Sequence, residues 1–131
     1  MTQTTSIPQR LKSTQVAILR ETLAKAQGNR CAICQLPLTK AVLDHDHSTG
    51  AVRATLHAGC NSLLGKVENN YKRYGVTNLA AFLAGTAAYL QRHTINQTGW
   101  LHNTHKTDDE KRIKRNATAR SKRAASKPTE F

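Results

Sequence analysis

The sequence predicts a small α+β domain whose hydrophobic core needs additional support. The chain has 131 residues, of which 38% are hydrophobic and 5% aromatic, which fits one domain with a small core. Apolar residues recur at helical spacing on both sides of a turn-rich segment that holds two short strand patterns, and this arrangement predicts the α+β class. All three cysteines lie within that turn-rich segment, between Cys31 and Cys60, and supply the candidate support.

The first regular element is a predicted helix over residues 14–26. Ser13 is a candidate N-cap, apolar residues follow at helical spacing, and Gly28 is a stop signal. The elements expected after it are short strands near 40–45 and 50–56, a helix over 61–71 and a helix over 77–92.

The charge balance indicates the class of partner. The chain has 20 Lys plus Arg against 8 Asp plus Glu, a formal net charge of +12, which favours a polyanion. It has no apolar run of about 18 residues and no apolar stretch near its N-terminus, so we expect neither a membrane segment nor a secretory signal. Three cysteines make a poor disulfide framework, and a reducing cytoplasm is the expected location.

Three regions follow from this composition. Residues 1–12 are polar and predicted to be disordered, residues 13–102 form the folded domain, and residues 103–131 form a basic tail. Eight Lys or Arg and no acidic residue lie between residues 111 and 127, and such a segment buries too little surface to fold alone. We therefore predict a disordered tail that either tracks phosphates in a salt-sensitive way or only solubilises the chain.

The cysteines form part of a predicted zinc site. Cys31-Ala-Ile-Cys34 and His57-Ala-Gly-Cys60 are two half-sites, each with two residues between its ligands. Two such pairs fit tetrahedral zinc, and four protein ligands leave no open position, so the ion would be structural. The alternatives are unrelated buried thiols or a redox pair, but no βαβ pattern surrounds Cys31 and Cys34.

Between the half-sites lie four consecutive titratable residues, Asp44-His45-Asp46-His47. In a strand, the two carboxylates would face one side and the two imidazoles the other. A carboxylate can bind a hard cation such as Mg²⁺, and a neutral imidazole can accept a proton from water. On composition alone, the segment could equally be a solvated loop, or its histidines could be alternative zinc ligands.

The chain resembles the phage recombination endonuclease VII family, part of the His-Me finger group that includes HNH nucleases. The resemblance is strong over residues 28–66. The strings that carry it are Cys31-Ala-Ile-Cys34, Leu43-Asp44-His45-Asp46-His47, Val52-Arg53, Cys60-Asn61 and Leu64-Gly65.

The resemblance implies a ββα-metal finger, in which a hairpin and the helix after it form a nuclease site. Asp44 and Asn61 would hold Mg²⁺ or Mn²⁺, and His45 would be the general base that activates water. His47 would contact the phosphate or assist proton transfer, so His45, His47 and Asn61 form the implied catalytic set. The implied activity is DNA hydrolysis to 3′-hydroxyl and 5′-phosphate ends.

The family pattern also assigns the remaining site residues. Cys31, Cys34 and Cys60 match family zinc ligands, and His57 stands where relatives usually carry a cysteine. Leu64 stands where some relatives carry an acidic residue, which bears on metal details. Arg53 matches a basic position that could contact phosphate. Independently of the family, the basic segment from Lys66 through Arg73 is expected to follow phosphates, which adds Lys66, Lys72 and Arg73 as DNA contacts.

The expected partner is DNA, with no organic cofactor, and helices 14–26 and 77–92 could pair in a homodimer that resolves branched DNA. Two alternatives stay open: an HNH nicking or homing endonuclease without branch preference, and a zinc module that binds nucleic acid without cleaving it.

Overall fold

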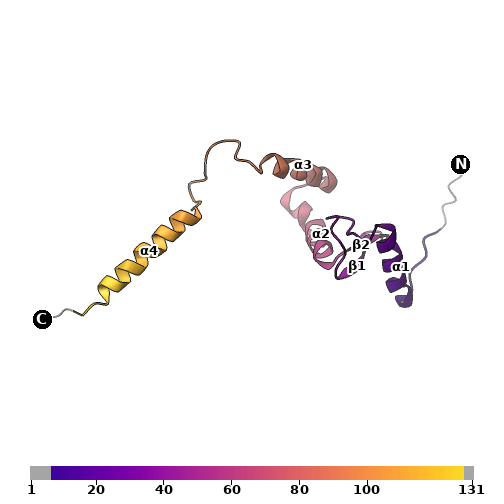
Figure 1. The fold of residues 1–131 in the computed structure, drawn as a ribbon. Coiled ribbons are helices and arrows are strands. Elements are labelled where there is room, and N and C mark those ends of the chain that lie inside the picture. Colours follow the sequence, from indigo (N-terminus) through magenta and orange to yellow (C-terminus); the bar gives the residue numbers. More distant parts are fainter. Residues whose placement is uncertain (1–6, 129–131) are drawn as a thin grey trace. The chain divides into compact units, whose positions relative to one another are not determined.

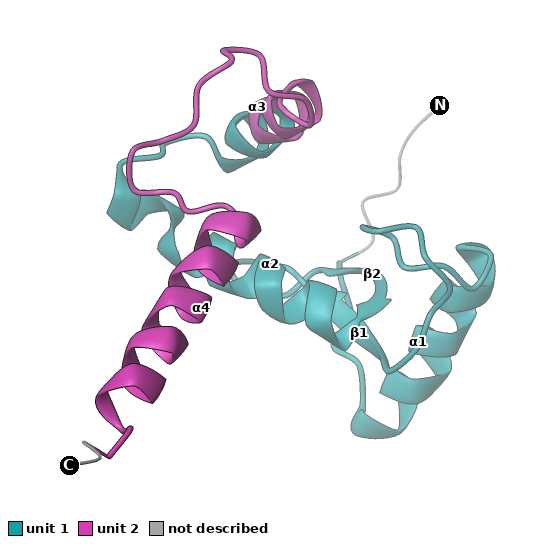
Figure 2. Cartoon of the chain, turned by 60° about the vertical axis from the view of Figure 1, so that its left-hand side comes forward, with its two compact units in different colours: residues 1–84 teal, residues 85–131 magenta. Residues whose placement is uncertain are grey.

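The computed structural model describes residues 7–128, and the chain divides into two compact units, residues 1–84 and 85–131 (Figure 2). The predicted N-terminal tail lies partly outside the described residues, and residues 7–12 have no regular secondary structure. The element order is α1 (Ser13–Ala26), β1 (Ala41–His45), β2 (Val52–His57), α2 (Ala58–Asn70), the 3₁₀ helix η1 (Tyr71–Tyr74), α3 (Leu79–Arg92) and α4 (Asp108–Ala125). No helix of the described part of the chain is long and apolar enough to cross a membrane.

The predicted α+β class is confirmed, and the elements expected within residues 13–92 form close to their predicted positions. The largest shift is in α2, which begins at Ala58 rather than at 61, directly after β2. In the first unit the two strands form a hairpin that lies between α1 and α2 (Figure 1). Helix α3 spans the boundary between the two units.

The hairpin is antiparallel and contains an irregularity at Asp44. Leu43 pairs with Thr55 and His45 pairs with Val52, so one residue of β1 lies opposite two residues of β2, Arg53 and Ala54. Such a bulge locally changes the direction of side chains along the strand. Here it places Arg53 against Asp44.

One side chain of the segment that follows α1 connects this helix to the hairpin. The Gln27 amide donates to the Thr55 carbonyl at 2.8 Å and accepts from the Thr55 backbone N–H at 2.9 Å. The Thr55 hydroxyl donates to the Arg20 carbonyl of α1 at 2.7 Å. Gln27 therefore satisfies the N–H and the carbonyl of Thr55, which the two-stranded sheet leaves without a strand partner.

The buried core of the described residues is very small. Cys31, Asp44, Thr55 and Leu56 are the only ones among them classed as buried, with 5% exposure or less. Two of these four are polar, and one is a predicted zinc ligand. The first unit therefore depends on polar and metal-binding interactions as much as on apolar packing.

The prediction that residues 103–131 are disordered is wrong for most of this segment, because α4 is an 18-residue helix. Its N-cap is Thr107, whose hydroxyl accepts the Glu110 N–H at 3.2 Å while the Glu110 carboxylate accepts the Thr107 N–H at 2.7 Å. Acidic residues occupy its first turn and basic residues its last, which complements the helix dipole. Local capping therefore stabilises a helix that buries no residue. The prediction of disorder considered only the surface that the segment could bury and left this contribution out.

Candidate metal centre and hairpin site

The first half of the metal centre is a tight turn that presents Cys31 and Cys34. The Cys31 N–H donates to the Leu36 carbonyl at 2.9 Å, and the Gln35 N–H donates to the Cys31 carbonyl at 3.0 Å. Gln35 adopts the left-handed conformation (φ 64°) that closes the turn. The two thiols therefore point to the same side of the turn.

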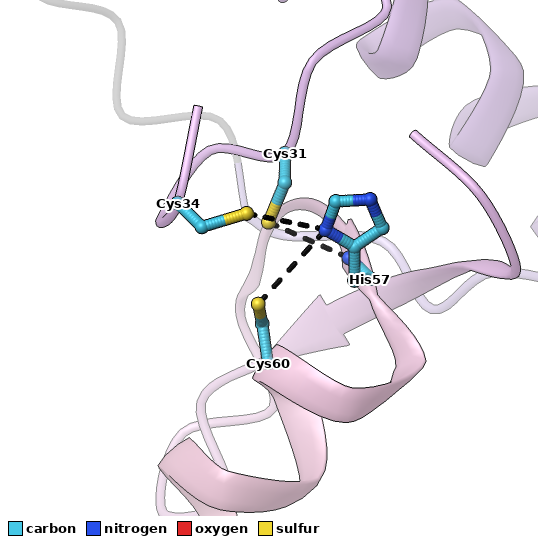
Figure 3. A group of neighbouring side chains, drawn as sticks. All are labelled: Cys31, Cys34, His57 and Cys60. Carbon is cyan, nitrogen blue, oxygen red and sulfur yellow. Dashed lines mark hydrogen bonds between the residues drawn. The ribbon is translucent and has the colours of Figure 1, made fainter. Parts of the chain in front are cut away.

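The second half lies at the junction between β2 and α2. His57 ends β2 and is the N-cap of α2, and Cys60 is in the first turn of the helix. The four ligand atoms of Cys31, Cys34, His57 and Cys60 all lie within 4.8 Å of one another (Figure 3). The structure thus brings together all four predicted zinc ligands.

The His57 ring is oriented as a zinc ligand. Its Nε2 is 2.8 Å from the Pro37 carbonyl, which can only accept, so Nε2 carries the proton and Nδ1 keeps a free lone pair. Nδ1 lies 3.2 Å from Cys34 Sγ and 3.9 Å from Cys60 Sγ. Zn–S and Zn–N bonds of about 2.3 and 2.0 Å require a separation of about 3.5 Å between the nitrogen and each sulfur in a tetrahedron. The cluster is compatible with structural zinc, and Pro37 supplies the outer hydrogen bond that typically orients a ligating histidine.

The thiols of this cluster differ in acidity. Burial raises the pKa of Cys31, but the N–H groups of Cys34, His57 and Ile33 outweigh it and lower this pKa to about 6. Burial, followed by hydrogen bonds with Cys34 and Cys31, raises the pKa of Cys60 to about 11. Cys31 is therefore better prepared for metal binding than Cys60, because the thiolate is the ligand.

Beside this centre, Asp44, Arg53 and Glu68 form an ion-pair network. Arg53 donates to both oxygens of the buried Asp44, from Nε at 2.6 Å and from Nη2 at 3.1 Å. It also donates to Glu68 of α2, from Nη1 at 3.0 Å and from Nη2 at 2.9 Å. Hydrogen bonds with Glu68 and then Asp44 raise the pKa of Arg53 above its usual value. Four guanidinium hydrogen bonds thus join β1, β2 and α2.

The remaining residues of the titratable run have distinct positions. His45 and His47 are exposed, and their ring centroids lie 5.0 Å apart. The Asp46 carboxylate accepts from the Ser48 hydroxyl at 2.6 Å and from the N–H groups of Ser48 and Thr49. These bonds, the Ser48 hydroxyl first, lower the pKa of Asp46 to about 2. Asp46 therefore holds the hairpin turn.

The other predicted site residues lie on α2 and η1. Asn61 is the fourth residue of α2 and is half-buried, whereas Lys66, Lys72 and Arg73 are exposed. A hollow between the hairpin turn and the end of α2 has His47, Glu68 and Lys72 in its lining. His45 lines a different hollow, on the side of α1.

Sequence reasoning missed Glu68 and Gln27. Glu68 follows Asn61 by seven residues, a spacing that places both on one face of a helix, so the signal was present. Gln27 bonds to backbone 28 residues away, and no pattern in the sequence marks such a contact.

Comparison with known proteins gives one result. A comparison with curated proteins found no match. A family model described as recombination endonuclease VII matches residues 8–92, which is more than half of the chain and includes both half-sites and the hairpin. The chain therefore belongs to the recombination endonuclease VII family.

Proposed function

We propose that this protein is a metal-dependent DNA endonuclease that leaves 3′-hydroxyl and 5′-phosphate ends. Its membership of an endonuclease family supports a nuclease. The observation that carries the proposal is the hairpin with adjacent Asp44 and His45, supported on one side by the zinc-compatible cluster and followed directly by α2 with Asn61. That order of elements matches the implied ββα-metal finger.

In this proposal His45 is the general base. Its ring is exposed at the end of β1, where a water molecule and a phosphodiester can reach it. A neutral imidazole there accepts the proton of the attacking water, which contributes about 10²–10⁴-fold in rate. His47, whose ring centroid lies 5.0 Å from that of His45, would contact the scissile phosphate.

Asp44 and Asn61 would hold the catalytic Mg²⁺ or Mn²⁺. Their carboxylate and amide oxygens are the donors that such hard cations prefer. Within the described part of the chain, the Asn61 side chain makes no hydrogen bond that would compete. A bound cation would stabilise the extra charge of the transition state and the leaving oxygen. Neighbouring phosphates would be contacted by the exposed cations Lys66, Lys72 and Arg73. Arg53 would contact a phosphate only after breaking its hydrogen bonds with Asp44 or Glu68.

The test compares the wild-type protein with His45→Ala on plasmid and linear duplex DNA, with Mg²⁺ or Mn²⁺. We expect divalent-ion-dependent cleavage that falls about 10²–10⁴-fold in His45→Ala while DNA binding persists. His105→Ala is the matched control, because His105 lies outside the family match. Ligation and end-labelling of the products identify the ends. Cleavage by His45→Ala at the wild-type rate would refute the role of His45.

One observation favours a second candidate, a zinc module that binds DNA without cleaving it. Both oxygens of Asp44 are already bonded to Arg53, as expected of a structural carboxylate. This candidate predicts DNA binding without cleavage at any concentration of Mg²⁺ or Mn²⁺. Cleavage abolished by chelation and restored by Mg²⁺, with zinc retained, would exclude it.

We also propose a homodimer that resolves branched DNA in the cytoplasm. Four large apolar side chains of α3 are at least 39% exposed, and a second copy could cover them: Phe82, Leu83, Tyr89 and Leu90. Three free cysteines suit a reducing compartment. Light scattering gives the oligomeric state, and rates on a four-way junction and a linear duplex distinguish a resolvase from an HNH nicking or homing endonuclease.

A further inference from the structure

We propose that α4 is a second DNA contact, separate from the hairpin site, and that it binds duplex DNA through one of its faces. This face carries the basic stripe, defined as Lys111, Arg115 and Lys122. The inference rests on the proposed function, since it takes DNA as the partner, but α4 lies outside residues 8–92 that match the family.

Charge is strongly segregated along α4. Its three acidic residues are all in the first turn, and residues 111–125 contain seven Lys or Arg and no acid. Lys111 and Arg112 pair with Asp108 and Asp109 at 3.5 and 3.0 Å, but these pairs are exposed and therefore weak. The acids support the start of the helix, and the rest of α4 remains a cationic rod.

The cations of the basic stripe share one side of this rod. At about 100° per residue, Lys111, Arg115 and Lys122 lie within about 40° of one another, and they span about 16 Å along the axis. A shallow hollow on this side is lined by the stripe together with Lys114, Thr118 and Ala119. The two small residues leave room for a sugar-phosphate backbone to approach the helix between the cations.

The chemistry of α4 favours a duplex over a membrane surface. Interfacial helices bury a face of Trp, Phe or Leu, whereas the side of α4 opposite the stripe offers Ile113, Ala117 and Ala124. None of the residues of α4 is buried, so the whole helix is available. The major groove, about 12 Å wide, admits an α-helix whose basic side chains reach the flanking phosphates.

The test uses two triple variants of the full-length chain that remove the same charge from different faces. Lys111→Gln, Arg115→Gln and Lys122→Gln remove the basic stripe. Arg112→Gln, Arg120→Gln and Arg123→Gln remove three charges at least about 60° away around the helix. Gln keeps helix propensity close to that of Lys and Arg, and circular dichroism checks that α4 persists.

Binding to a fluorescent duplex is measured by anisotropy over a range of salt concentrations, without Mg²⁺, so that no cleavage occurs. We expect the stripe variant to lose at least tenfold in affinity and the control variant less than threefold. The slope of log affinity against log salt should fall by up to about 2.7 in the stripe variant, at about 0.9 per phosphate contact. Equal losses in both variants, no loss in either, or stronger stripe-dependent binding to RNA or anionic vesicles would overturn the proposal.

This readout is independent of cleavage. A wild-type protein that never cleaves, yet binds duplex through the stripe, would refute the proposed nuclease and leave the role of α4 intact. Cleavage that depends on His45, combined with DNA binding that does not change when the basic stripe is removed, would support the proposed nuclease and refute the role of α4.

Discussion

Arg53 Nε lies 2.6 Å from Asp44 Oδ2, across the bulge of the hairpin. Asp44 is only 5% exposed, and Arg53 bonds to both of its carboxylate oxygens. These are the oxygens that would hold a divalent cation in the proposed endonuclease. A guanidinium and a metal ion would therefore compete for the same carboxylate, and Arg53 would hold Asp44 in the metal-free protein.

We predict that Arg53→Gln increases the affinity for Mn²⁺ about tenfold, because it removes a competing positive charge next to Asp44. Electron paramagnetic resonance measures free Mn²⁺ during titration of the zinc-loaded protein. The exposed Arg73 gives the matched control, Arg73→Gln, which should change the affinity little. Weaker Mn²⁺ binding by Arg53→Gln would show that the guanidinium assists the metal rather than competing with it.

Glu68→Gln should have the opposite effect and weaken Mn²⁺ binding about three- to tenfold. The change removes a negative charge near the site and also leaves Arg53 to interact more strongly with Asp44 alone. The same titration measures it, with Glu21→Gln on α1 as a control of equal charge change. Equal shifts in both variants would indicate a general effect of net charge.

How much of the site the sequence predicts depends on how far apart in the chain the interacting residues lie. Both zinc half-sites are local, with ligands three residues apart, so spacing alone predicts Cys31, Cys34, His57 and Cys60. The pairing of Arg53 with Asp44 depends on a bulge, and strand register is a tertiary property that no local pattern reveals.

Helix α4 shows a different reason for error. Its sequence contains a capping box at Thr107 and acids in the first turn, both readable without a structure. The prediction of disorder considered only the lack of apolar residues. Isolated helices are marginal in water when they are shorter than about 12–15 residues, and α4, with 18 residues, is longer than this.

Gln27→Ala should lower the free energy of unfolding by about 2–3 kcal/mol. The change leaves the N–H of the fully buried Thr55 without its partner, and a buried unsatisfied group costs about 1–3 kcal/mol. The Thr55 carbonyl also loses its shorter hydrogen bond and keeps only the Ala32 N–H at 3.5 Å. Urea denaturation of zinc-loaded protein measures the difference, with Gln9→Ala as an exposed control. A change below about 0.5 kcal/mol would mean that water replaces the amide.

Zinc removal should unfold the first unit, because the described residues bury only four side chains and one of these is Cys31. His57→Ala leaves three thiols for the ion and should lose zinc and melt at a lower temperature. His57→Cys should keep one zinc per chain, since a fourth thiolate completes the tetrahedron even without the hydrogen bond to Pro37.

Mass spectrometry of the native protein counts the zinc, and thermal melts with and without a chelator measure its contribution. His105→Ala, at an exposed histidine outside the cluster, should retain zinc and melt as the wild type does. A chelator-treated wild type with an unchanged melt and circular dichroism spectrum would contradict the structural role of zinc. In that case the four side chains would have to hold the turn and α2 together through their own hydrogen bonds. This alternative is weak, because the contacts around His57 are 3.2 to 3.9 Å long.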